Sequence, residues 1–94
     1  MAVQSQRGPL ALARRRIDAL DRRIARLLAR RLRLVEGLAP LKERVRDVPR
    51  EAAVLDNVRA AAGRKRVSRE FCAEVYCAVL RVSRRHVARR CRRI

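Results

Sequence analysis

Two cations on the apolar stripe of a predicted helix are the residues best suited to chemistry. From Leu10 to Leu41, apolar residues recur in alternating steps of three and four, and Arg31 occupies one of these positions. Lys42 follows eleven residues later, so the two cations share a helix face about 16 Å apart. A charge on such a stripe is costly unless it is paired or binds an anion. The pattern suits a small, flat dianion on an apolar floor, and two surface cations in a basic chain give the same spacing.

The helix that carries these cations is predicted to run from Leu10 to about residue 46, with Gly37 and Pro40 weakening its last turns. Such a helix is about 55 Å long at 1.5 Å per residue. Two shorter helices of the same chain cannot cover its apolar stripe, and an exposed stripe of this size is avoided by soluble monomers. We therefore predict a homodimer in which the two long helices pack along each other.

Two further helices complete the predicted all-α fold. Asp47 is a suitable N-cap for the second helix, which ends at Gly63. Ser68 is a suitable N-cap for the third, which runs toward Cys91. The predicted inward side of the third helix consists of Cys72, Val75, Tyr76, Val79, Leu80, Ser83 and Val87.

Length and composition limit the remaining possibilities. The 94 residues suffice for one domain, predicted over residues 10–94 behind a flexible tail of residues 1–9. A hydrophobic content of 49% argues against disorder, and the few aromatic residues argue against a β-sandwich. No apolar run approaches the roughly 18 residues of a membrane span, and the N-terminus lacks the pattern of a signal peptide. We therefore expect a cytoplasmic protein without a membrane partner.

The formal charge of +17 raises the possibility of nucleic-acid binding. Lys42 and Lys65 are the only lysines, and so strong a skew toward arginine can reflect codon composition. The few aromatic residues available to stack on bases argue against a nucleic-acid partner, and a basic helical dimer that binds nucleic acid is kept as an alternative. Solvated faces are predicted for Arg15, Arg16, Arg22, Arg23, Arg26, Arg30, Arg33, Arg84, Arg85, Arg89, Arg90, Arg92 and Arg93.

The cysteines give no sign of a metal site. Cys72, Cys77 and Cys91 are odd in number and form no CxxC pair, so we expect reduced thiols buried as small hydrophobic residues.

Five segments, taken in order, resemble the motifs of a known family. Residues 13–21 match Arg-x-x-Ile-Asp-x-Ile/Leu-Asp, residues 27–31 match Leu-Leu-x-x-Arg, and residues 38–42 are like Ile-Ala-x-x-Lys. Residues 47–55 match Asp-x-x-Arg-Glu-x-x-Val-Leu, and residues 71–83 are like a third helix with an inward serine. Together they resemble the all-helical chorismate mutases. The resemblance implies an intertwined homodimer that converts chorismate to prephenate by a Claisen rearrangement.

The same resemblance assigns the cations of the site. It places Arg31, Lys42 and Arg50 against the substrate within one subunit, with Arg14 reaching in from the other. Arg31 and Arg14 would bind the two carboxylates, and Lys42 the ether oxygen that gains negative charge as its bond breaks. A pericyclic reaction needs a compact substrate conformer and well-placed cations, so no metal and no cofactor are implied.

The resemblance also assigns the remaining polar residues. Asp47 and Glu51 would engage the ring hydroxyl or orient the cations, and Ser83 would help to hold a carboxylate. Four residues after the serine the family has Gln or Glu, a second donor to the ether oxygen, and this chain has Val87. His86 replaces that donor if the third helix is rotated slightly, and is otherwise a surface histidine.

The valine leaves several functions open. Activity toward chorismate is expected to be low, or the substrate is a relative, as in an isochorismate pyruvate-lyase or an aminodeoxychorismate mutase. A catalytically inactive member that serves as a regulatory subunit is a further alternative.

Overall fold

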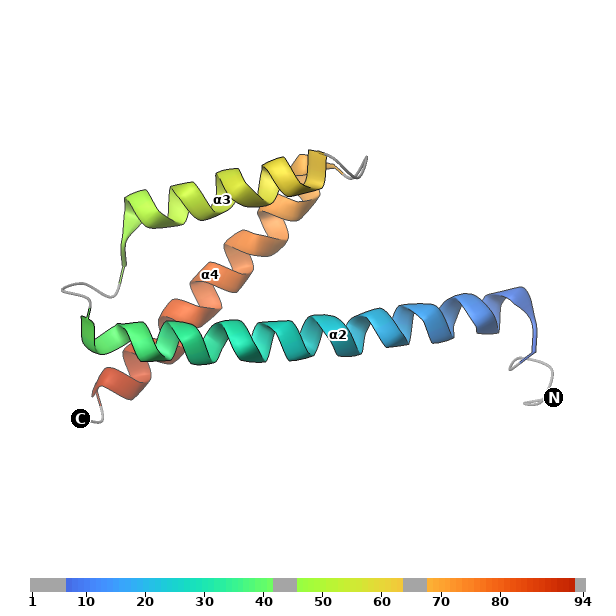
Figure 1. The fold of residues 1–94 in the computed structure, drawn as a ribbon, viewed down its shortest axis with the longest axis horizontal. Coiled ribbons are helices and arrows are strands. Elements are labelled where there is room, and N and C mark those ends of the chain that lie inside the picture. Colours follow the sequence, from blue (N-terminus) through green and yellow to red (C-terminus); the bar gives the residue numbers. More distant parts are fainter. Residues whose placement is uncertain (1–6, 42–45, 64–67, 93–94) are drawn as a thin grey trace. The chain divides into compact units, whose positions relative to one another are not determined.

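A computed structural model describes residues 7–41, 46–63 and 68–92, with side chains as far as Arg89. Within these ranges the chain forms three α-helices and one short 3-10 helix, and no strand. Figure 1 shows them in chain order as α2 in blue to green, α3 in yellow-green and α4 in orange to red. The predicted all-α class with a long first helix is therefore confirmed. The predicted tail falls mostly outside the described residues, since only Arg7 to Pro9 are covered.

The first helix is shorter than predicted. α2 spans Pro9–Leu38, and its 30 residues are about 45 Å long. The chain continues as a 3-10 helix, η1, over Ala39–Leu41, so the prediction of an α-helix to residue 46 is wrong. Pro40 explains the early end, because it lacks the backbone N–H that an α-helix would bond to the carbonyl of Glu36, and its ring clashes with that carbonyl in an α-helix.

The other two helices begin where the sequence predicts. α3 spans Val48–Gly63, directly after Asp47, and α4 spans Arg69–Arg92, directly after Ser68. The Ser68 hydroxyl accepts a hydrogen bond from the backbone N–H of Phe71 at 3.2 Å. Its carbonyl accepts another from the N–H of Cys72 at 3.2 Å. These two bonds satisfy donors that the start of a helix leaves unpaired.

By their internal contacts the residues fall into two units, divided after Leu34. The second unit contains the end of α2 together with α3 and α4, and in it α3 packs against α4. Ala62, Ala73, Leu80 and Val87 are its buried apolar residues. The last three follow one another at intervals of seven along α4, so a single stripe of that helix is covered.

The predicted inward side of α4 is only partly correct. Cys72, Tyr76, Val79 and Ser83 are half-buried, as expected for the flanks of the covered stripe. Val75 is 49% exposed, and Phe71 and Val82 lie on the same side of the helix with more than half of their surface exposed. The prediction that Val75 faces inward is therefore wrong for the single chain.

The first unit consists mainly of α2 up to Leu34. Among its described residues only Ala11 is buried. We call five of its apolar residues, which share one face, the α2 stripe, and each is at least 52% exposed: Ile17, Leu20, Ile24, Leu27 and Leu34. The half-buried Arg31 lies between the last two.

Two further predictions concern membrane-spanning segments and the burial of the cysteines. Over the described ranges, no helix combines the length and the apolar character that crossing a membrane requires. Cys72 and Cys77 are free thiols. Cys77 is exposed, so the prediction of a buried thiol is wrong there. It lies four residues after Ala73 and three before Leu80, at the edge of the covered stripe, and is left uncovered. The side chain of Cys91 lies outside the described residues.

Candidate functional site

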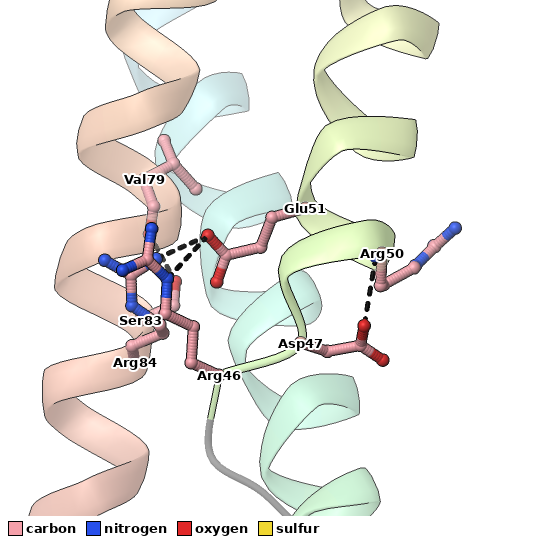
Figure 2. Close-up of polar contacts among 7 residues, drawn as sticks. All are labelled: Arg46, Asp47, Arg50, Glu51, Val79, Ser83 and Arg84. Carbon is pink, nitrogen blue, oxygen red and sulfur yellow. Dashed lines mark hydrogen bonds and ion pairs between the residues drawn. The ribbon is translucent and has the colours of Figure 1, made fainter.

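The first turn of α3 is fixed by Asp47. Its Oδ1 accepts a hydrogen bond from the backbone N–H of Arg50 at 3.1 Å, and its backbone carbonyl accepts one from the backbone N–H of Glu51 at 2.9 Å. A carboxylate in this position satisfies unpaired donors and complements the helix dipole. In Figure 2 the side chains of Asp47 and Arg50 lie on the side of α3 away from α4.

Glu51, one turn further along α3, points toward α4. Its Oε1 accepts a hydrogen bond from Nη1 of Arg84 at 2.5 Å, and lies 3.9 Å from Nε of Arg46 (Figure 2). The side chains of Glu51 and Arg84 are 18% and 26% exposed, whereas that of Arg46 is 63% exposed. The pair with Arg84 is thus the sheltered one, and it links two helices across 33 positions of sequence.

The prediction of a solvated side chain is wrong for Arg84. It is half-buried and paired with Glu51, a predicted site residue. A signal was present in its spacing. Arg84 lies four residues after Leu80 and three before Val87, so it shares a helix face with two buried residues.

Ser83 already has a partner in its own helix. Its hydroxyl donates to the carbonyl oxygen of Val79 at 2.6 Å, as is common for serine within helices. A carboxylate can only accept hydrogen bonds, so Ser83 must turn its hydroxyl away from Val79 before it can hold one. In Figure 2 Ser83 lies beside Arg84, on the side of α4 toward Glu51.

The structure separates the roles of Val87 and His86. Val87 is 7% exposed, on the covered stripe of α4. The His86 side chain is 44% exposed, and its Nε2 lies 3.8 Å from Oε2 of Glu36, near the end of α2. Val87 therefore occupies the inward position four residues after Ser83, and the imidazole of His86 lies toward a carboxylate.

The remaining predicted cations are distributed as follows. Arg14 is exposed and Arg31 half-buried, both on α2, and Arg50 is exposed at the start of α3. Lys42, the predicted donor to the ether oxygen, lies outside the described residues. Within the second unit, the structure brings Glu51, Ser83 and Arg84 together and directs Arg50 away from them.

A comparison of the sequence with models of known protein families identifies the family of the chain. Residues 13–88 match the family described as chorismate mutase type II. The chain belongs to the type II chorismate mutase family. No curated protein and no solved structure gave a significant match.

The family match covers the whole candidate site. It includes each residue assigned by motif, from Arg14 to Val87, and it also includes Arg84. Around the sheltered Glu51, the described residues place two arginines, Arg84 and Arg46.

Proposed function

We propose that the chain is a chorismate mutase, which rearranges chorismate to prephenate in a pocket lined by arginine and lysine. The single observation that carries the proposal is the family match over residues 13–88, within which the five motifs stand in order. The reaction breaks a C–O bond and forms a C–C bond within one molecule. Catalysis then consists of holding a compact conformer and stabilising charge that develops on the ether oxygen.

The proposed roles are divided between two subunits. Arg31 and Arg14 of the partner subunit bind the two carboxylates of the substrate. Lys42 donates to the ether oxygen, and Arg50 contacts the substrate in the same subunit. Glu51 and Asp47 act at the ring hydroxyl or orient these cations, and Ser83 assists in holding a carboxylate once its hydroxyl has turned.

The exposed α2 stripe supports the proposed dimer. Five large apolar side chains on one face, each at least half exposed, are unfavourable in water. A second α2 packed along this face removes them from solvent. It also brings Arg14 of the partner subunit to a site built on the other chain, which a monomer cannot complete.

Val87 favours a second candidate function. The buried apolar side chain cannot donate to the ether oxygen, so the proposed mutase acts there with Lys42 alone. This favours slow turnover of chorismate or a related substrate, isochorismate or aminodeoxychorismate, at the same cations.

The test is the loss of chorismate absorbance with purified protein, with isochorismate run in parallel. Appearance of prephenate is the expected result. Release of pyruvate from isochorismate, without turnover of chorismate, would reassign the chain to lyase chemistry. Binding of neither compound by the folded protein would contradict the proposal, and retention on nucleic acid would then favour the basic-dimer alternative.

A further inference from the structure

The ion pair between Glu51 and Arg84 carries an inference about how the site is organised. It is half-buried on both sides and joins α3 to α4 at 2.5 Å. Removing two charges from water offsets much of their attraction, so stability alone explains such a pair poorly. A charged pair does, however, restrict the rotamers of both side chains.

The two arginine contacts of Glu51 fall on one oxygen of its carboxylate. Both Arg84 and Arg46 approach Oε1, and Oε2 takes part in neither contact. An arginine facing a carboxylate often engages both oxygens through two parallel hydrogen bonds. Neither of these two arginines engages the second oxygen, and a carboxylate oxygen accepts well from a hydroxyl group.

The backbone beneath Glu51 is also fixed. The N–H of Glu51 donates to the carbonyl of Asp47, and the Asp47 carboxylate caps the same turn. The cap holds the main chain and Arg84 holds the side chain. The orientation of Oε2 is thus determined from both ends.

We infer that Arg84 is a positioning residue, which anchors Oε1 of Glu51 so that Oε2 accepts a hydrogen bond from the ring hydroxyl of the substrate. This inference rests on the proposed function. Arg84 itself touches no substrate atom in this arrangement. It makes Glu51 selective for a ring that carries a hydrogen-bond donor at the corresponding position.

The test compares Arg84→Met with Arg85→Met, since Arg85 is the exposed neighbour on the same helix. With chorismate, Arg84→Met should raise KM about tenfold with kcat within about twofold, because ground state and transition state lose the same contact. Arg85→Met should leave both within about twofold. Arg84→Lys keeps a cation at this position, so its KM should lie within about threefold of the wild-type value.

A second substrate separates positioning from a structural role. For a chorismate analogue with hydrogen in place of the ring hydroxyl, Arg84→Met should change KM less than about twofold. In a Glu51→Gln background, the effect of Arg84→Met should likewise be mostly lost. These readouts do not follow from a general loosening of the fold, which would penalise both substrates equally.

Other outcomes would overturn the inference. Equal losses for chorismate and the analogue would show that Arg84 acts elsewhere or only on folding. An unchanged KM in Arg84→Met would show that the pair is dispensable. Complete inactivity of the wild type would instead overturn the proposed function, so the two failures are distinguishable.

Discussion

The second unit and the first unit bury their apolar residues to very different extents. In the second unit, Ala62, Leu80 and Val87 are covered within one chain, and a sheltered ion pair joins α3 to α4. Along α2 as far as Leu34, the apolar side chains are equally regular in sequence but remain exposed. Hydrophobic periodicity therefore identifies the apolar face of a helix, without showing whether that face is covered within one chain.

The largest expected effect comes from placing a charge on the α2 stripe. Leu27→Glu would bury an unpaired carboxylate in the proposed dimer, at a cost of roughly 3–5 kcal/mol. We expect dissociation at micromolar concentration by sedimentation, and loss of at least 100-fold in kcat/KM. Leu12→Glu is the matched control on the same helix, since Leu12 lies off the stripe and is 43% exposed.

A wild-type monomer at micromolar concentration, or equal effects of the two substitutions, would contradict the proposed dimer along the α2 stripe.

We expect the next largest effect at Arg31, because this cation occupies a position that continues the apolar spacing of the α2 stripe. A charged hydrogen bond to a substrate carboxylate contributes roughly 1.5–3 kcal/mol, so Arg31→Ala should lower kcat/KM roughly 10- to 100-fold. Arg33→Ala, two positions along and exposed, should change it less than about twofold. Steady-state kinetics measures both. Similar, mild losses would mean that Arg31 has no special role.

A smaller effect, and a gain, is expected at Val87 on the covered side of α4. Val87→Gln adds a neutral donor near the breaking bond, and removing a comparable donor elsewhere costs about 3–4 kcal/mol. Allowing for imperfect placement, we expect kcat for chorismate to rise about tenfold with KM little changed.

His86→Ala is the matched control for that experiment, because the imidazole lies toward Glu36. It should leave turnover nearly unchanged. Abolished activity in His86→Ala, with no gain from Val87→Gln, would mean that the helix positions have been assigned one residue out of step.

The smallest effect concerns the start of α3. Asp47→Ala removes a helix cap, which typically lowers the free energy of unfolding by about 1 kcal/mol. Asp56→Ala, in the exposed middle of the same helix, removes a surface pair with Arg59 at 3.4 Å and should lower it less than about 0.5 kcal/mol. Urea unfolding measures the difference. If the two variants are equally stable, the cap contributes little to the second unit.

Local chemistry made much of the fold predictable. Asp47 and Ser68 specify the starts of α3 and α4 because a cap acts within a few residues of itself. The end of α2 differs from the prediction, since the apolar steps continue to Leu41 while Pro40 breaks the regular α-helix that would place them on one face. The apolar periodicity favours a longer helix and proline favours an earlier end, and the observed end at Leu38 follows the proline.

The site was less predictable than the fold. The motifs indicate Glu51, but its pair with Arg84 joins positions that no local pattern connects. In a chain with 26 lysines and arginines, one informative arginine is hidden among many solvated ones. The roles assigned to Arg14, Arg50 and Lys42, and the expected cytoplasmic location, stay predictions.

The exposed α2 stripe has a consequence for the order of assembly. α3 and α4 are consecutive helices, so their pairing closes a short loop, which is a fast, unimolecular event. If the α2 stripe is covered by a second chain, that step is a bimolecular encounter whose rate depends on protein concentration. Diluting the unfolded protein before refolding should therefore delay the recovery of activity while leaving the pairing of α3 with α4 unaffected.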